Sequence, residues 1–367
     1  MARYRDQVGL SRAQTQERNR AKVLAAAREE FAERGFRDAK IDSIAARAGL
    51  TRGAVYSNFP GKRALYFAVL AEVEWPAPPN PTLGRSPAEA LGALARAWVA
   101  RLDGPEARLG VDLFGEVQAD ESVRTPFTRL MILDALLLGL ALERLRPPAP
   151  GARLVRLAET ALTMLHGARR LAAAAPGFGE AFDVVSACER LAGLELNDYW
   201  APPRLAPPTR PASEPWSPPP AVDLVTGSPA RLDGGVVAVL GPHRLPAVEE
   251  AVRAGAGSPV TVVLVTGAPA ELDPLARLVI GELCGCLRQS FPRTAWPPVQ
   301  VVCDPAGSVA AAAGVPAVSD GTEAAVRVED GRIVSRADGF GACHAVAAEH
   351  DSKHSGSAAP GHAAGLF

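Results

Sequence analysis

The chain has 367 residues, which predicts two or three domains rather than one. Apolar residues make up 48% of it, so there is material for more than one hydrophobic core. The charge is uneven: residues 1–70 carry 14 Lys or Arg against 7 Asp or Glu, whereas residues 71–367 carry 25 against 33. A basic N-terminal end on an acidic remainder is typical of a protein that presents one end to a polyanion.

Nothing in the sequence indicates export or a membrane span. The N-terminus is polar and charged to about residue 22, without the apolar segment of a secretory signal. The most apolar window, 130–142, is shorter than a span needs and contains Asp134. The five cysteines are an odd number without a framework spacing. We therefore expect a cytoplasmic protein in a reducing compartment.

Residues 11–70 predict a compact head of three helices. The first helix, 16–34, places apolar residues at intervals of four and ends at Gly35, a typical helix-ending glycine: Val23, Ala27 and Phe31. The second helix spans 40–48. A tight turn, Gly49-Leu50-Thr51, follows, and Thr51 is placed to cap the third helix. On that helix Val55 and Phe59 face inward, which leaves a polar face outward.

This arrangement predicts a helix-turn-helix, whose second helix enters the major groove of DNA. Arg52 is suited to guanine or phosphate, Gly53 to a close approach of the backbone, and Ala54 to a thymine methyl. Tyr56 and Lys62 are expected to contact phosphates. The predicted DNA-contacting residues are Lys40, Thr51, Arg52, Gly53, Ala54, Tyr56, Ser57 and Lys62. The alternative for this segment is a structural three-helix unit that binds no DNA.

Residues 18–66 resemble the DNA-binding domain of the TetR family of one-component repressors. The matching residues are Phe31, Gly35, Phe36, Ile44, Ala45, Ala48, Gly49, Leu50, Thr51, Gly53, Val55, Tyr56, Phe59, Lys62 and Leu65. One departure is Lys40, where the family has Thr or Ser, so a charge stands in place of a capping hydroxyl. The resemblance implies an all-α N-terminal part and sequence-specific binding to double-stranded DNA.

Residues 71–200 predict a body of about five amphipathic helices, near 87–103, 106–119, 122–146, 152–174 and 178–197. The TetR resemblance implies that this body holds an inducer cavity and that its last two helices, near 153–174 and 178–196, pair with a second subunit. A candidate seam is Leu154, Leu157, Ala161, Met164, Leu165 and Ala168. Candidate ligand-binding residues are Trp98, Phe114, Phe127, Met131, Met164 and His166, for which ordinary core packing is the alternative.

Residues 201–221 contain nine prolines and are expected to form a semi-rigid extended linker without a sheet ladder. Residues 222–349 alternate valine-rich strands with helical segments, which predicts a largely parallel sheet covered on both faces. Residues 350–367 are rich in Gly, Ala, Ser and His and are expected to be disordered.

Residues 235–340 are similar to the thioredoxin-like fold, an α/β fold. The order is strand 236–240, helix 243–254, strand 260–266, helix 274–290, strand 299–303 and a hairpin of 324–328 with 332–336. In that fold Pro316 is placed as the cis-proline. An active member carries Cys-x-x-Cys after the first strand, but this chain has Gly241-Pro242-His243-Arg244. The departure predicts a domain without disulfide exchange, used for binding, packing or modulating a dimer.

The cysteines are expected to be free small hydrophobes, with a thiol sensor as the alternative. Cys284 and Cys286 are two apart on a predicted helix, so their side chains diverge by about 200°. No ligand quartet has a recognisable metal spacing, and no metal site or cofactor is predicted. The function predicted is a non-enzymatic, homodimeric regulator, a repressor released from a palindromic operator by a small-molecule inducer. A redox protein, or a thiol-responsive regulator that uses the C-terminal domain, is the alternative.

Overall fold

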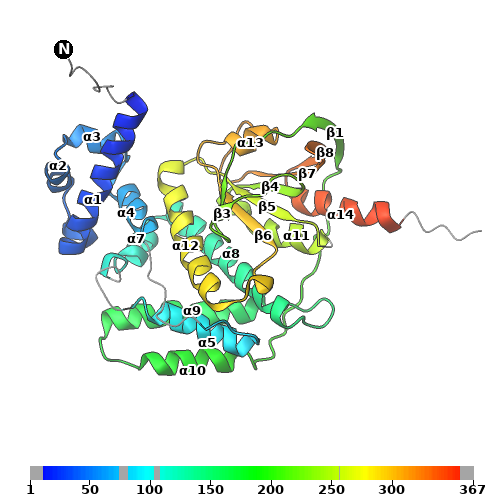
Figure 1. The fold of residues 1–367 in the computed structure, drawn as a ribbon, viewed down its shortest axis with the longest axis horizontal. Coiled ribbons are helices and arrows are strands. Elements are labelled where there is room, and N and C mark those ends of the chain that lie inside the picture. The colour runs from blue at the N-terminus through cyan, green and yellow to red at the C-terminus, as the bar shows by residue number, and fades with distance from the viewer. Residues whose placement is uncertain (1–10, 74–81, 103–107, 256, 356–367) are drawn as a thin grey trace, which may run out of the picture.

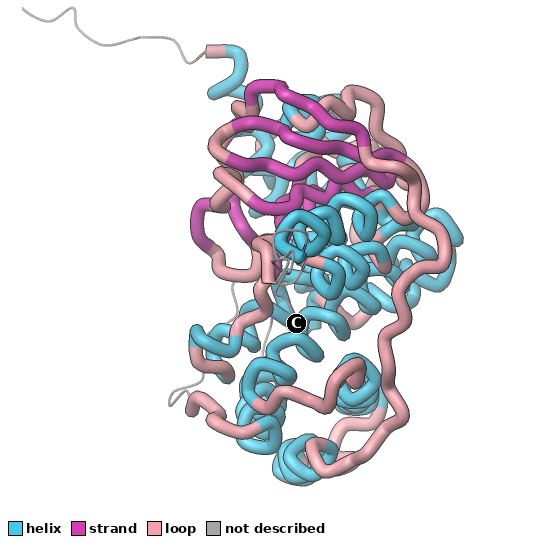
Figure 2. Tube along the Cα trace, turned by 90° about the vertical axis from the view of Figure 1, so that its right-hand side faces the viewer, coloured by secondary structure: helices cyan, strands magenta, loops and turns pink. Residues whose placement is uncertain are grey.

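The computed structural model describes residues 11–73, 82–102, 108–255 and 257–355. A small helical head, a helical body and an α/β domain follow one another along the chain (Figure 1). Turning the molecule shows the strands gathered at one end and most of the body helices at the other (Figure 2). The predicted change from helical to mixed architecture is therefore present.

The head consists of α1 (Arg12–Asp38), α2 (Ile41–Ala48) and α3 (Arg52–Tyr56). Ser11 caps α1 through a reciprocal capping box with Gln14. Gly35, with φ of 71°, interrupts α1 at the predicted point, and one more turn follows before Asp38. The predicted stripe of Val23, Ala27 and Phe31 is at most 2% exposed and forms the inner face of the head.

The described body helices are α4 (Lys62–Ala71), α5 (Pro87–Val99), α7 (Leu113–Ala119), α8 (Glu121–Leu145), α9 (Val155–Ala174) and α10 (Ala181–Leu191). Of the last five, α5, α8 and α9 follow the predicted spans closely, whereas α7 begins later than the predicted 106 and α10 ends earlier than the predicted 197. Among the described helices, α8 alone is long and apolar enough to cross a membrane by length and composition. Its apolar window is 67% buried inside the protein, which is typical of a core helix.

The main sheet has the order β1-β8-β7-β4-β5-β6. Its strands are β1 (Arg210–Pro215), β4 (Gly235–Leu240), β5 (Val260–Leu264), β6 (Val299–Cys303), β7 (Glu323–Glu329) and β8 (Arg332–Asp338). The neighbours β4, β5 and β6 are parallel, while β7, β8 and β1 add antiparallel pairs, so the sheet is mixed. A separate pair is formed by β2 (Val222–Asp223) and β3 (Ser228–Pro229).

Both faces of the sheet are buried, as predicted. Side chains alternate along β4, so Val236 and Ala238 join the large core while Val237 and Val239 join a smaller one. The helices of this domain are η1 (Pro242–Arg244), α11 (Ala247–Ala254), α12 (Pro269–Ser290), η2 (Arg293–Ala295), α13 (Ser308–Ala312) and α14 (Ala342–Ser355).

Four expectations for the C-terminal part were wrong. The sheet was expected to be largely parallel, but only the β4–β5 and β5–β6 pairs are parallel, because the β7–β8 hairpin and the edge strand β1 add three antiparallel pairs to the same sheet. The proline-rich segment 201–221 contains β1, which pairs with β8; proline is tolerated there because β1 is an edge strand. The segment expected to be disordered from 350 begins inside α14, which is helical to Ser355; residues 356–367 lie outside the described residues. The described residues contain no cis peptide bond, so the bond before Pro316 is trans.

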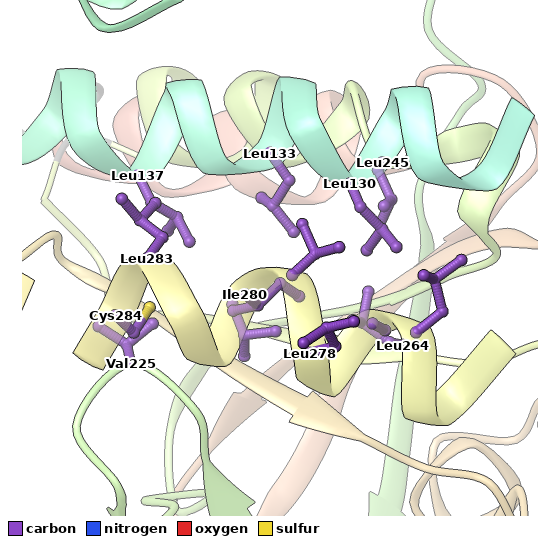
Figure 3. Packing of buried hydrophobic residues seen from close by; sticks show 14 of the residues in the cluster. Leu130, Leu133, Leu137, Val225, Leu245, Leu264, Leu278, Ile280, Leu283 and Cys284 are labelled. Carbon is purple, nitrogen blue, oxygen red and sulfur yellow. The ribbon is translucent and has the colours of Figure 1, made fainter. Parts of the chain in front are cut away.

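The C-terminal domain is joined to the body through α12, which packs against α4, α5 and α8. Figure 3 shows the contact: Leu130, Leu133 and Leu137 on α8 face Leu278, Ile280 and Leu283 on α12. One buried apolar cluster runs from the head through the body to one face of the sheet. Because that core is continuous, the C-terminal domain is part of the same packed unit as the body.

Candidate nucleic-acid interface

The turn between α2 and α3 is built from backbone and capping interactions. Gly49 ends α2 in the left-handed conformation, with φ of 63°, which glycine adopts without strain. The Thr51 hydroxyl accepts a hydrogen bond from the amide of Ala54 at 3.2 Å and so caps α3, as predicted. Val55 and Phe59 are 1% and 2% exposed and fix α3 against the head. The opposite face of α3 therefore lies in solvent.

That outward face carries most of the predicted contact residues. Arg52, Gly53, Tyr56 and Ser57 are exposed, and Ala54 is half-buried. The Arg52 guanidinium lies over the Tyr56 ring, 5.6 Å from its centroid, and 3.6 Å from the carboxylate of Asp42. Its hydrogen bond to the Tyr56 hydroxyl and the charge of Asp42 raise the pKa of Arg52 further. The side chain is a permanent cation held at the surface.

Gly53 has room for a side chain. A Cβ built there would meet only the Thr51 hydroxyl oxygen, at 3.8 Å, which is ordinary contact. The fold of the head thus gives no reason for glycine at this position. A close approach of some other surface to the α3 backbone would give one.

The two lysines differ in their surroundings. Lys40 is exposed and precedes α2 without a side-chain capping bond, as its replacement of Ser or Thr suggested. The Lys62 amino group donates to the carbonyls of Phe36, Arg37 and Ala39 at 2.7, 3.1 and 3.2 Å. All three of its donors are therefore occupied at the C-terminal end of α1. Lys62 ties α4 to α1, a role that sequence reasoning missed, and its predicted phosphate contact stays a prediction.

A buried carboxylate orders the start of α2. Glu30 on α1 is fully buried, and its oxygens lie 3.3 Å from Nε of Arg34 and 3.2 Å from Nε of Arg47. One of them also accepts the backbone N–H of Lys40 at 3.4 Å. These bonds hold α2 against α1 and so set the angle at which α3 is presented.

The head is connected to the rest of the protein through α4. The ring of Tyr66 on α4 meets Phe31 edge-on at 5.2 Å, and its hydroxyl donates to the carbonyl of Leu109. Arg63, at the start of α4, joins three parts of the chain: Asp120 at the start of α8, at 2.8 Å, and Glu271 on α12, at 2.5 Å. The body helices α4 and α8 and the C-terminal domain therefore meet at one arginine.

A small cavity lies among α5, α7, α8 and α9 of the body and α12 of the C-terminal domain. Five of the six predicted ligand-binding residues line it together: Trp98, Phe114, Phe127, Met131 and His166. Met164 is not among the lining residues and packs against the core instead. Sequence reasoning missed the other wall, which α12 supplies with Leu278, Val279 and Glu282. Its free volume of about 20 Å³, measured for the centre of a water-sized sphere, is room for about one water molecule.

Ionisable groups from three helices surround this cavity. Arg169 on α9 pairs in a bidentate way with Glu282 on α12. Burial opposes ionisation of Glu282, but the Arg169 charge and hydrogen bond outweigh it and keep its pKa below the ordinary value. Burial, and secondarily the charge of Glu282, raises the pKa of Asp134 well above its ordinary value. Burial lowers the pKa of His166 to about 4, so its imidazole is neutral at neutral pH.

Three of the six residues predicted for the dimer seam are buried in the core of the chain. Leu157, Ala161 and Leu165 on α9 are at most 2% exposed and face the core of their own protomer, so they are unavailable to a partner. Large apolar side chains are instead exposed near the end of α9, in the connection that follows it and at the start of α10: Leu171 (46%), Phe178 (69%) and Phe182 (75%). An exposed apolar patch of this kind is typical of a protein interface.

The cysteines show no sign of redox chemistry. All five are free, and burial raises the pKa of the Cys284, Cys286 and Cys343 thiols, which disfavours the reactive thiolate. Within the parts of the chain that the structure describes, no three or more His, Cys, Asp or Glu side chains gather as a metal site would require.

Comparison with known proteins identifies the head. Residues 23–69 match the family model "Bacterial regulatory proteins, tetR family". The HTH-type transcriptional regulator SrpR of Pseudomonas putida is 47% identical over 60 residues, which are 16% of this chain and 28% of that protein. The HTH-type transcriptional activator FasR of Mycolicibacterium smegmatis is 45% identical over 51 residues, 14% of this chain and 23% of that protein. The chain thus spans less than half the length of the curated relatives it matches.

Solved structures overlap over a longer range but loosely. NalD, the secondary repressor of the MexAB-OprM efflux pump in Pseudomonas aeruginosa, is 20% identical with a TM-score of 0.34, covering 48% of this chain and 96% of that one. A TetR regulator from Rhodococcus sp. RHA1 is 18% identical with a TM-score of 0.32, covering 48% and 94%. TM-scores this low do not define a shared architecture. The similarity to the tetR family of bacterial regulatory proteins therefore comes from the sequence match, which covers residues 23–69 and so the helix-turn-helix of the head.

Proposed function

We propose that this protein is a cytoplasmic, sequence-specific transcriptional regulator that binds a palindromic operator as a homodimer. The observation that carries the proposal is α3, which presents Arg52, Gly53 and Tyr56 to solvent from a head of the tetR type. Two such heads would read two half-sites in successive major grooves. The exposed Leu171, Phe178 and Phe182 support a partner subunit at α9 and α10.

We further propose that a small molecule bound in the helical body releases the protein from DNA. The cavity among α5, α7, α8, α9 and α12 supports this, because α12 also packs against α4, which follows the head, and holds Arg63 at the start of α4 through Glu271. A ligand acts as an inducer only if it prefers the arrangement of heads that does not fit the operator. Repression is the direction proposed.

The C-terminal domain is proposed to be thioredoxin-like in fold and inactive in disulfide exchange. Parallel strands with crossover helices, a closing antiparallel hairpin (β7 and β8) and a final helix support the fold. The segment after β4 is Gly241-Pro242-His243-Arg244, and α8 packs against it, which supports a packing role. An insulin-reduction assay on the full chain should give only background; turnover above background would favour the redox alternative.

Gel-shift titration tests the proposed function. The probe is duplex DNA from upstream of the protein's own gene, with a scrambled duplex of equal length and composition as the control. We expect tighter binding to the natural sequence, and loss of that preference in Arg52→Ala, because the guanidinium supplies base-edge contacts. Equal affinity for both duplexes would reject the proposal.

A further inference from the structure

The cavity lined by α5, α7, α8, α9 and α12 contains a carboxyl group without a partner. Asp134 on α8 is 2% exposed, lines the cavity, and its Oδ1 makes no hydrogen bond. The nearby acid, Glu282, already holds Arg169. The lining contains two carboxyl groups and one cationic side chain, and a second buried cation, Arg101, donates to the backbone carbonyl of Glu282 at 3.2 Å and helps to lower the pKa of the Glu282 carboxyl. Asp134 is thus the carboxyl group left without a partner, and a buried polar group in this state is costly.

A second polar atom is unsatisfied in the same lining. Nδ1 of His166 is buried and makes no hydrogen bond, and the His166 ring lies edge-on to Trp98 at 4.8 Å and to Phe114 at 5.9 Å. Phe127 meets Phe114 edge-on at 5.8 Å. The unpartnered carboxyl thus lines the same cavity as these aromatic rings. Guanidinium groups already lie over two of them, Arg169 over Trp98 at 4.7 Å and Arg170 over Phe114 at 4.9 Å, so the aromatic side suits an apolar group.

The wall opposite Asp134 belongs to the C-terminal domain. Leu278, Val279 and Glu282 on α12 close the space, which has room for about one water. Any larger molecule therefore has to move α12 away from α8. The N-terminal end of α12 carries Glu271, whose carboxylate holds Arg63 at the start of α4. Movement of α12 would therefore shift Glu271 and, through Arg63, displace α4, the helix that joins the body to the head.

We propose that this cavity binds a small organic cation, a protonated amine on an apolar body, with Asp134 as its counter-ion and α12 as the wall that moves. The ammonium group supplies the positive charge that pairs with Asp134, since Glu282 is already paired with Arg169. The apolar body of the ligand lies against the aromatic side of the cavity. The proposal rests on the proposed function, since it names the ligand class of the regulator and makes the C-terminal domain part of its sensor.

Calorimetry on the full chain tests the ligand class. The probes are benzylamine, the uncharged benzyl alcohol and the anionic benzoate, which share one ring. We expect benzylamine to bind best and Asp134→Asn to weaken it by about tenfold or more, because a charge-assisted bond is lost. Benzyl alcohol should change by less than about twofold. Equal binding of the three probes, no binding of benzylamine, or an unaltered benzylamine affinity in Asp134→Asn would overturn the proposal.

Proton release gives an independent readout. The ionisable groups near Asp134 are Glu282 on α12, Arg169 and His166 on α9, and the Cys284 thiol. Because burial raises the pKa of Asp134 well above its ordinary value, an ion pair with benzylamine should expel a proton from this carboxyl group, seen as a heat that varies with the ionisation enthalpy of the buffer. Asp134→Asn should abolish that dependence. A release that persists in the variant would contradict the role of Asp134.

The coupling to the head is tested separately. In Glu271→Gln, benzylamine should still bind, but its effect on DNA affinity should fall, since the link to Arg63 is broken. An undiminished effect would overturn the proposed route through α12. Operator binding without ligand is the control in every variant: loss of sequence preference there would count against the proposed function, whereas intact preference with no cation selectivity would count against the ligand class alone.

Discussion

Charged side chains are exposed on the recognition helix α3 but buried in the cavity among α5, α7, α8, α9 and α12. On α3, Arg52 lies in solvent beside Asp42 and Tyr56, where a charge costs little and an ion pair contributes little to stability. In the cavity, Asp134 and Glu282 are buried, so each charge must be paired or neutralised. A substitution on the exposed face of α3 can therefore change DNA binding with little effect on stability. A substitution of a charged group in the cavity also changes the free energy of unfolding.

The largest expected effect is at the buried pair. Glu282→Ala leaves the Arg169 guanidinium without its carboxylate, and we expect the free energy of unfolding to fall by about 3 kcal/mol or more in urea titrations. Glu189→Ala, which removes the partly exposed partner of Arg96, is the control and should cost less than about 1 kcal/mol. Similar losses in the two variants would erase the contrast between buried and exposed pairs.

The next largest effect is expected on the pH dependence of stability. His166 has a pKa of about 4 in the folded protein, below its ordinary value of 6.5, so the unfolded chain binds the proton more readily. Its contribution is therefore full above pH 6.5 and is lost as the pH falls toward 4, by up to about 3 kcal/mol. His166→Gln should lose less stability between pH 7 and pH 4.5 than the wild type. Identical pH profiles for His166→Gln and the wild type would show that His166 does not titrate differently on unfolding.

The two lysines of the head sharpen the comparison within one domain. Lys62→Met removes three hydrogen bonds to carbonyls at the end of α1, and we expect it to lower stability by about 1–2 kcal/mol. Lys40→Met should leave thermal unfolding unchanged and reduce the salt dependence of DNA binding, because Lys40 is exposed. A stable Lys62→Met protein with a reduced salt slope would support the original phosphate role instead.

The smallest effect on stability is expected at Gly53. Gly53→Ala adds a methyl group where space exists and should be neutral or stabilising by up to about 1 kcal/mol, since alanine favours helix. DNA affinity should nevertheless fall by about tenfold, because the methyl group would separate α3 from the duplex. Unchanged affinity in gel shifts would mean that the α3 backbone does not approach DNA closely.

Much of the head could be predicted because its determinants are local. The helix-ending Gly35, the turn at Gly49 and the cap at Thr51 act within a few residues of one another, and Val55 and Phe59 repeat at helical spacing. Five of the six residues that were predicted to line a pocket also line one cavity in the structure. Its polar part was missed, apart from His166, because Arg169 and Glu282 are distant in sequence and meet only when α12 docks.

The prediction that residues 201–221 form a linker outside the sheet failed for a similar reason. The prolines of 201–221 correctly indicate extended backbone, but the partner strand β8 lies more than a hundred residues later and leaves no local signal. Asp134 did leave one, as the acid inside the apolar window 130–142, and an interruption of that kind in a core helix is a useful indication of a site.

Selection of binding sites from random duplex DNA tests the central claim most directly. Purified full-length protein should enrich an inverted repeat whose half-sites are about one helical turn apart, as two copies of α3 require. Arg52→Ala should fail to enrich the same half-site while remaining folded. Sequences that stay random after repeated rounds with the wild type, or a half-site that Arg52→Ala still selects, would contradict sequence reading by α3.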